Sequence, residues 1–392
     1  MPADPSSPAQ RLDEVQVHID AGEFEAALAL AQSLRAQFEA QGDAALQLNA
    51  EVYLVRSLVK LERFSAAIAH AEVLLTPLAA AAPSAERAEL LVRMAYAQAQ
   101  LSRYEASMRA AHLALQDALA LGSGLMAAQA LERMAMCCMM LGDAVQSERF
   151  MLEALGFYEQ SQAAEHMLRA SSNALFLFCN VHDDLLEQGE AQAAAALLQR
   201  SQRVVVRVAG ALGQARSAYM ACMWRANHGR WLLRRGLSEQ AEAQMREVQQ
   251  RASERSWHPI RRPMNLELAR LLEARGGPAQ PAQPAELAHL AEAAALLIAM
   301  FEPSEAPLRD RLAVQALARL PALLRATGDM EAARHYQRQQ IVLTERLRQQ
   351  RLLAQKHVQD LGELAGVMLA EADQRRLEAE LARLRQHYDR TC

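Results

Sequence analysis

A short phrase of residues recurs along the chain at a nearly constant spacing, and this repetition limits the fold more than any other feature. The first copy reads Gly22-Glu23-Phe24-Glu25-Ala26-Ala27, and later copies keep a small residue, an anchor position and a small residue three positions further on. The anchors are Phe24, Phe64, Tyr104, Ala144, Ala191, Ser238 and Met330, at spacings of 40, 40, 40, 47, 47 and 92 residues. A fixed period of this size predicts a stacked array of repeats. Because the last spacing is twice 46, one further copy is expected near Pro284.

Each copy of the phrase fits the turn between two antiparallel helices. Glycine or a small polar residue ends one helix, and the anchor opens the next. Apolar residues then follow at helical spacing, as in Ala27, Leu30, Leu34 and Phe38. One hairpin alone cannot bury its apolar face, whereas stacked hairpins can. The sequence therefore predicts an all-α fold: a right-handed α-solenoid of about eight helical hairpins, followed by a long C-terminal helix.

Proline, glycine and serine residues divide the chain into segments. Residues 1–9 are expected to be a disordered leader, residues 10–340 the solenoid, and residues 341–392 a connector helix with a short coiled coil. Pro83 and Ser84 predict the end of one helix and the cap of the next. The segment Trp257–Pro263 is expected to break the chain before the seventh hairpin. The eighth hairpin should begin near Ser304, with its second helix starting near Met330.

Composition limits the compartment and the partners. The net charge of −4 gives no bulk attraction to nucleic acid or to an anionic membrane. No apolar run reaches the length of a membrane span, and the first residues lack the pattern of a signal peptide. The cysteines are odd in number, and Cys137 and Cys138 are adjacent, which suits a reducing compartment. We expect a cytoplasmic protein with no nucleic-acid partner, no membrane partner and no cofactor.

The last part of the C-terminal helix changes its apolar period from 3.6 to 3.5 residues per turn. A heptad seam is predicted at Val367, Ala370, Gln374, Leu377, Leu381, Leu384 and Tyr388. This pattern favours a homodimer. Flanking charges leave its orientation open, since Glu380 and Arg385 would attract across a parallel pair while Asp373 and Glu378 would repel. The alternative is that Leu377–Tyr388 packs against the last hairpin of its own chain.

The turns with glycine, an aromatic residue and alanine resemble those of tetratricopeptide repeats, although the period of 40 to 47 residues exceeds the usual 34. Long repeats followed by a helix rich in Glu, Leu and Arg (Gln374–Leu384) resemble the N-terminal sensory region of bacterial GGDEF diguanylate cyclases. The GGDEF motif is absent from this sequence. The resemblance therefore implies a regulatory input region, in cyclic-di-GMP signalling, rather than the cyclase activity. The alternative is a stand-alone adaptor or scaffold.

No sequence motif points to catalysis. The chain lacks a nucleophile elbow, a P-loop, a dinucleotide-binding glycine motif and a His-Glu-x-x-His zinc motif. Cys179 and His182 share one helical face and give a less favoured alternative, an enzyme or metal site. Cys222 and His228 lie one hairpin later, but no second Cys-x-x-His completes a set of four ligands. The run Met134–Met140 fits helix packing. We expect no catalytic residue and no metal site.

A concave groove is the expected functional surface, because in tetratricopeptide arrays the first helix of each hairpin faces the ligand. Residues 15, 11, 8 and 4 positions before an anchor share this face. The predicted groove residues are Asn49, Tyr53, Arg56, Arg93, Tyr96, Arg133, Asn180, Asp183, Asn227, Arg230 and Arg234, and Lys60 ends the same row in the second hairpin. The arginines would bind carboxylates or phosphates, and Asn180 and Asn227 would bind a peptide backbone. The partner would be a protein or peptide. Alternatively, the row is the solvated face of ordinary helices.

Overall fold

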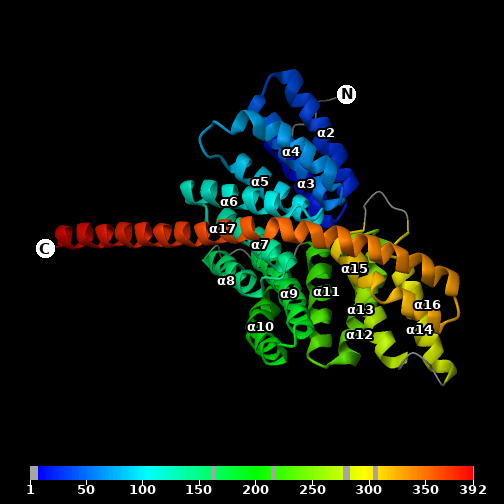
Figure 1. Ribbon diagram of the computed structural model, residues 1–392. Helices are drawn as coiled ribbons and strands as arrows, with labels where there is room; N and C mark the ends of the chain where they lie inside the picture. The colour runs from blue at the N-terminus through cyan, green and yellow to red at the C-terminus, as the bar shows by residue number, and fades with distance from the viewer. Residues whose placement is uncertain (1–7, 161–163, 213–216, 277–282, 303–307, 392) are drawn as a thin grey trace.

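The computed structural model describes residues 8–160, 164–212, 217–276, 283–302 and 308–391, and all regular structure in these ranges is α-helical. Helices pair in sequence order into stacked hairpins (Figure 1). The first four hairpins are α1 (Pro8–Ala21) with α2 (Phe24–Gln41), α3 (Ala44–Lys60) with α4 (Phe64–Leu78), α5 (Ala85–Gln100) with α6 (Tyr104–Ala120), and α7 (Gly124–Leu141) with α8 (Ala144–Gln160). Three more are α9 (Ala164–Glu187) with α10 (Ala191–Leu212), α11 (Ala218–Arg234) with α12 (Ser238–Glu254), and α13 (His258–Gly276) with α14 (Pro284–Ile298). The predicted all-α solenoid is confirmed.

The recurring phrase marks the helix starts. Helices begin at all seven anchors, and α14 begins at Pro284, where the hidden copy was expected. Ser84 caps α5, since its hydroxyl accepts a hydrogen bond from the backbone N–H of Arg87 at 3.2 Å. The local rules of helix ends thus account for most boundaries.

The last hairpin differs from the others. Its first arm is split into α15 (Asp310–Leu317) and α16 (Leu320–Ala326), while its second arm is the long helix α17 (Met330–Thr391). The expected start near Ser304 lies outside the described residues. Pro321 stands in the first turn of α16, where its missing N–H is tolerated but where it cannot continue a preceding helix.

Apolar anchors and small residues build three hydrophobic core clusters between the hairpins of the described chain. Phe24, Phe64 and Tyr104 are all less than 7% exposed. The methionine and cysteine run of α7 is buried as well, and the Cys137 thiol donates to the backbone oxygen of Tyr104 at 3.2 Å. This run packs helices together, as its composition predicted.

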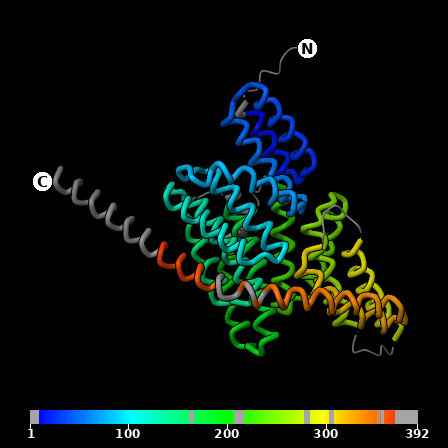
Figure 2. Tube along the Cα trace, turned by 45° about the horizontal axis from the view of Figure 1, so that its top comes forward, coloured from blue at the N-terminus to red at the C-terminus, as the bar shows by residue number. Residues whose placement is uncertain are grey.

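The array closes on itself, so its first hairpin contacts its sixth and seventh. The hydroxyl of Ser217 donates to the backbone oxygen of Asp20 at 2.6 Å, and the indole N–H of Trp257 donates to that of Gly22 at 3.0 Å. The rings of Phe24, Tyr219 and Trp257 stack edge to face in a row, with centroid distances of 5.0 and 5.2 Å. The blue N-terminal hairpin accordingly lies beside the green and yellow-green helices (Figure 2). The segment Trp257–Pro263, expected as a simple break, also closes the array.

In the described part of the chain, three turns of the array carry a side chain where most of the others carry glycine, at Glu62, Ser102 and Ser256, and the first two make long-range contacts. Glu62 and Ser102 have φ near +59°, the left-handed region that glycine favours. The Glu62 carboxylate lies 3.3 Å from the Arg262 guanidinium and 2.5 Å from that of Arg309. The Ser102 hydroxyl donates to Asp310 at 2.9 Å. The departures from glycine at Glu62 and Ser102 therefore connect early hairpins to the last ones.

Helix α17 crosses the body of the array in both views (Figures 1 and 2). Its Ala354, Val358 and Ala365 are buried in the core cluster that α6, α7 and α8 contribute. Gly362 lies against Phe150, with its backbone oxygen 3.4 Å from the guanidinium of Arg149. The helix passes residue 340 without a break, so the predicted boundary between solenoid and connector falls inside one element and remains a prediction.

The predicted dimer seam is described only at its start. Val367 is 55% exposed, whereas the side chains of the other seam residues, Ala370 to Tyr388, lie outside the described part. The alternative packing of Leu377–Tyr388 falls there too, as do residues 1–7 of the predicted leader. These remain predictions.

Candidate functional site

The largest feature of the concave side is a cavity lined by the first helices of six consecutive hairpins. The space free of protein atoms at this site is about 1240 Å³, a figure that includes the solvent at its mouth. Its lining is Val59, Lys60, Arg93, Tyr96, Gln100, Glu132, Arg133, Met136, Met139, Met151, Arg169, Asn173, Phe176, Leu177, Tyr219, Met220, Met223, Ala226, Asn227, Pro259, Ile260, Pro263, Met264 and Arg309. We refer to it as the central cavity.

One wall of the central cavity is strongly basic. We call the group Arg56, Lys60, Arg93, Arg133 and Arg169 the cationic cluster; it comes from α3, α5, α7 and α9. Two carboxylates lie within it: Glu89 pairs with Arg93 at 2.5 Å, and Glu132 with Arg133 at 3.1 Å. Throughout the described ranges, no carboxylate lies within ion-pair distance of Arg56, Lys60 or Arg169. Positive charge therefore exceeds negative charge at this wall.

Lys60 is held in an unfavourable environment for its charge. Its ammonium lies 5.0 Å from the centre of the Tyr219 ring. Burial first, and then the neighbouring Arg93, Arg56, Arg169 and Arg133, lower the pKa of Lys60 to about 7. Lys60 therefore exchanges its proton near neutral pH.

The arginines of the cluster are only partly satisfied. Burial raises the pKa of Glu89, but Arg93 and Arg56 outweigh it and bring this pKa to about 2. Arg169 donates to the Tyr158 hydroxyl at 2.9 Å. The buried Nε atoms of Arg56, Arg133 and Arg169 have no hydrogen-bond partner in the described part of the chain. Donors of this kind match the acceptor oxygens of an anionic ligand.

The rest of the central cavity is apolar and adaptable. Methionines come from α7, α8, α11 and α13, and aromatic rings come from Tyr96, Phe176 and Tyr219. The Arg133 guanidinium lies 5.0 Å from the centre of the Tyr96 ring, which joins the basic wall to the apolar one. Methionine side chains repack around ligands of different shapes. The cavity thus suits a ligand with both anionic and apolar parts.

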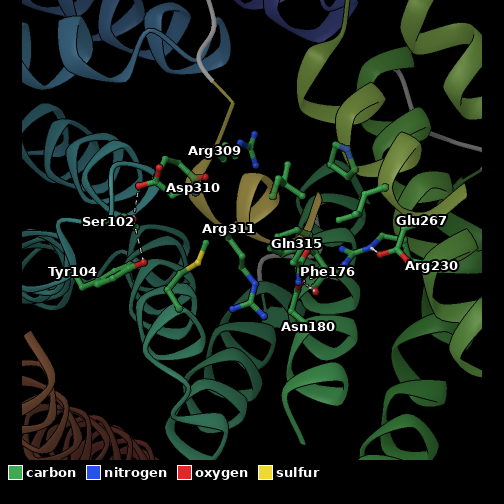
Figure 3. A pocket seen from close by; sticks show the side chains of 16 residues that line it. Ser102, Tyr104, Phe176, Asn180, Arg230, Glu267, Arg309, Asp310, Arg311 and Gln315 are labelled. Atoms are coloured by element: carbon green, nitrogen blue, oxygen red, sulfur yellow. Dashed lines mark hydrogen bonds and ion pairs between the residues drawn. The ribbon is translucent and has the colours of Figure 1, made fainter. Parts of the chain in front are cut away.

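A smaller cavity adjoins the central one and shares Gln100, Phe176, Pro263 and Arg309 with it (Figure 3). Its space free of protein atoms, solvent at the mouth included, is about 530 Å³, and its lining includes the contact between Ser102 and Asp310. On its other side stand Asn180, Arg230 and Glu267, and the Arg230 guanidinium lies 5.1 Å from the centre of the Phe176 ring. The Arg230 guanidinium and the Glu267 carboxylate are turned toward each other (Figure 3).

These charges belong to an ion-pair network that we call the paired cluster, consisting of Asp183, Arg230, Arg234, Glu267 and Arg270. Glu267 is 1% exposed and accepts from Arg230 at 2.9 Å and from Arg234 at 3.0 Å. Asp183 accepts from Arg234 at 2.6 Å and from Arg270 at 3.1 Å. Burial would raise the pKa of Glu267, but Arg234 and the other two guanidinium groups bring it to about 2. Every member of the paired cluster is thus held by another member.

The structure separates the predicted groove residues into three sets. Arg93, Tyr96, Arg133 and Asn227 line the central cavity, with Arg56 beside it, while Asn180 and Arg230 line the smaller one. Asp183 and Arg234 line neither cavity because the paired cluster holds them, and Asn49 and Tyr53 also line neither.

The proposed role of the two asparagines conflicts with their hydrogen bonds. The Asn227 amide donates to the backbone oxygen of Ser172 at 3.0 Å, and that of Asn180 to Phe176 at 2.6 Å. The Asn180 side-chain oxygen accepts from Arg230 at 3.4 Å. Their amide groups fix neighbouring helices, so they have little capacity left for a peptide backbone.

Sequence reasoning omitted three residues that matter to the central cavity. Lys60 stood on the predicted row of α3 but was not chosen. Arg169 lies seven residues before Phe176, hence on the same face of α9, and extending the row by two turns would have included it. Arg309 had no repeat signal, because it caps the irregular last hairpin.

The alternative site at Cys179 and His182 is a packed region. Cys179 is fully buried, and burial raises its pKa to about 11, which disfavours the thiolate that nucleophiles and metal ligands require. Cys222 is buried as well, and His228 stacks on Trp224. Among the residues that the structure describes, no three His, Cys, Asp or Glu side chains are grouped so that they could hold a metal ion.

None of the described helices combines the length and apolarity needed to cross a membrane.

Comparison with known proteins extends the description of the fold. No protein-family model and no curated protein matches this chain. Among solved structures, the Rap conjugation gene regulator of the plasmid pLS20 in complex with the Phr* peptide matches at 12% identity and a TM-score of 0.51, covering 88% of this chain and 98% of that one. A Rap protein complexed with Competence and Sporulation Factor matches at 14% identity and a TM-score of 0.49, covering 88% and 99%. The apo form of the quorum sensor NprR from B. thuringiensis matches at 13% identity and a TM-score of 0.29, covering 86% and 98%.

The match to the pLS20 regulator shows a shared fold that extends over nearly all of both chains. It agrees with the predicted tetratricopeptide-like repeats. The three structures give no support to the predicted relation to diguanylate cyclases.

Proposed function

We propose that this chain is a non-catalytic regulatory protein of bacterial signalling, which binds a peptide, or a peptide segment of a partner protein, in the central cavity. The observation that carries the proposal is the cavity itself, since six first helices converge on one space lined by basic, aromatic and methionine side chains. The solved regulator with the same fold was obtained in complex with a peptide, which supports the same class of ligand here. The predicted link to cyclic-di-GMP signalling has no such support.

A route from ligand to helix α17 supports a regulatory role. Arg346 of α17 pairs with Asp310 at 2.5 Å, and Asp310 in turn accepts from Ser102 beside the smaller cavity. Farther along, α17 packs on α6, α7 and α8 through Ala354, Val358 and Ala365. A ligand that shifts these hairpins would therefore shift the helix as well.

Peptide binding is tested by exposing the immobilised full chain to a synthetic library of random heptapeptides and identifying the retained peptides by mass spectrometry. The variant Met223→Trp fills the central cavity, whereas Leu152→Trp adds the same ring at a 50% exposed position of α8. We expect retention by the unmodified chain and by Leu152→Trp, and loss of retention in Met223→Trp. Equal retention by both variants would place binding elsewhere.

The proposed homodimer is tested separately by measuring molar mass in solution. A chain ending at Met368 keeps the buried contacts of Ala354, Val358 and Ala365 and removes the seam after Val367. We expect a dimer for residues 1–392 and a monomer for residues 1–368. Two monomers would exclude the seam as a dimer contact.

A further inference from the structure

The two walls of the central cavity define the chemistry of its ligand more narrowly than peptide binding alone. The cationic cluster has more positive charges than carboxylates, and the donors without partners belong to arginines that are themselves mostly buried. Arg133, for example, is 14% exposed. Desolvated cations are costly unless an opposite charge compensates them. Glu89 and Glu132 supply two negative charges for the five positive ones, so the carboxylates of a ligand would compensate the remainder.

We propose that the central cavity selects an acidic peptide, whose carboxylates bind Lys60, Arg133 and Arg169 and whose apolar side chains pack on the methionine and aromatic wall. This inference rests on the proposed function and names the class of peptide. Guanidinium groups bind carboxylates through paired hydrogen bonds, and a free C-terminus supplies the same group as Asp or Glu. The paired cluster has less uncompensated charge, because Asp183 and Glu267 bind its three guanidinium groups, although Arg230 Nη1 and Arg270 Nε also have no hydrogen-bond partner among the described residues.

The apolar wall favours a peptide over a small anion such as a nucleotide phosphate. Methionines from four helices, the rings of Tyr96, Phe176 and Tyr219, and aliphatic and proline side chains together form most of the lining. A phosphate alone would contact the basic wall and leave this apolar surface without a partner. A short chain with acidic and apolar side chains would cover both.

Binding of a carboxylate should add a proton to Lys60. The charged groups that act on its ammonium are Arg93 on α5, Arg56 on its own helix, Arg169 on α9 and Arg133 on α7, and the ring of Tyr219 on α11 lies beside it. The other titratable or charged groups at this wall are Glu89 and Glu132, which pair with Arg93 and Arg133, His166 beside Arg169, and Arg309, which pairs with Glu62. Cations dominate this set. A bound carboxylate would offset them and stabilise the protonated form of Lys60, so binding near neutral pH would take up a proton.

The test uses the same heptapeptide library with free C-termini and measures the amino-acid composition of the retained peptides. We expect retained peptides to be enriched in Asp and Glu and depleted in Lys and Arg. The variants Lys60→Met, Arg133→Gln and Arg169→Gln should each weaken the tightest retained peptide by about tenfold or more. The matched control is Arg109→Gln on α6, because Arg109 also pairs with a glutamate four residues earlier but is 57% exposed and lines neither cavity.

The outcomes separate this inference from the proposed function. Retained peptides without acidic preference would overturn the inference and leave peptide binding intact. If no peptide is retained, both fail, and retention of ATP or inorganic phosphate in a parallel arm would then assign the basic wall to small anions. Calorimetry of the tightest acidic peptide in two buffers of different ionisation enthalpy gives the second readout. Proton uptake at pH 7.5 should occur with the unmodified chain and vanish in Lys60→Met; equal uptake in both would exclude Lys60.

Discussion

The cationic cluster and the paired cluster lie on the same concave side and use the same residue types, yet they differ in how their charges are compensated. In the paired cluster, Glu267 and Asp183 together hold three guanidinium groups at 2.6 to 3.1 Å. In the cationic cluster, five basic groups have two acidic partners, and Lys60 has none among the described residues. Arginines in a groove therefore differ in function according to the carboxylates that other helices bring to them.

Mutation of the paired cluster should lower the free energy of unfolding. Replacing Glu267 by Gln leaves Arg230 and Arg234 buried without their shared carboxylate, so the free energy of unfolding should fall by about 3–5 kcal/mol. Urea unfolding followed by circular dichroism measures this. The control Glu292→Gln breaks a half-exposed pair with Arg246 and should cost about 0–1 kcal/mol. A similar small effect for both would show that the network contributes no more than a surface pair.

The contacts that close the array can be weakened by a substitution that leaves both clusters unchanged. Gly22 has a φ of +79°, and a Cβ placed there would lie 2.4 Å from the Trp257 indole nitrogen. We expect Gly22→Ala to lower the free energy of unfolding by about 2–4 kcal/mol, through backbone strain and the displaced indole. Gly42→Ala shares the positive φ but has open space around it, so it should cost only about 1–2 kcal/mol. Equal losses in the two variants would assign the whole effect to the backbone.

The cationic cluster should respond in the opposite direction from the paired one. Lys60→Met removes a desolvated charge beside four arginines, so the free energy of unfolding at pH 7 should rise by about 1–2 kcal/mol even as peptide binding weakens. A lower stability in this variant would mean that Lys60 has a stabilising partner, and would overturn the contrast between the clusters.

The pH dependence of the free energy of unfolding tests the same contrast between the two clusters. Lys60 has a pKa of about 7 in the folded chain and about 10.5 when unfolded. Between these values the unfolded state binds more protons, so this residue makes stability rise with pH. The advantage of Lys60→Met should therefore be largest at pH 7 and below, and should disappear as pH approaches 10.5. Thermal melts of the two chains at several pH values measure the difference, and a constant gap would contradict the assigned pKa.

The smallest effect is expected outside both clusters. Arg109→Gln removes an exposed pair with Glu105 on α6 and should change the free energy of unfolding by no more than about 0.5 kcal/mol. The same melting experiment provides the measurement. A change as large as that of Lys60→Met would mean that removing a charge alters the stability of this array wherever the charge lies, and not specifically at the central cavity.

Most of the fold follows from local signals in the sequence, whereas the state of its charges does not. Periodicity and caps predict helices that begin at Phe24, directly after Ser84 and at Pro284, because those rules act within a few residues. Arg230 and Glu267 are 37 residues apart and lie on two different helices. Nothing in the repeat pattern marks Glu267 as the partner of Arg230. The predicted row therefore found Arg93 and Arg133 but could not distinguish them from Arg230 and Arg234.

The structure also changes how the predicted groove should be probed. Charge reversal at Arg93 or Arg133 would place a new carboxylate beside Glu89 or Glu132, and the like charges would affect folding as well as binding. Neutral substitutions avoid this. Whether the groove residues bind a ligand stays a prediction until such variants are measured.

The contacts of Glu62, Ser102 and Trp257 with distant hairpins change how the molecule should lose its structure. An open solenoid resembles a row of units coupled only to their neighbours, and such a row can melt from its ends. Here the early units are also coupled to the late ones through the contacts of Glu62 with Arg262 and Arg309, of Ser102 with Asp310, and of Trp257 with Gly22. The row therefore behaves as a ring, in which neither end can fray without breaking a second interface. Unfolding of the repeats should consequently be one cooperative event, and repeats cannot be added or removed without reopening that ring.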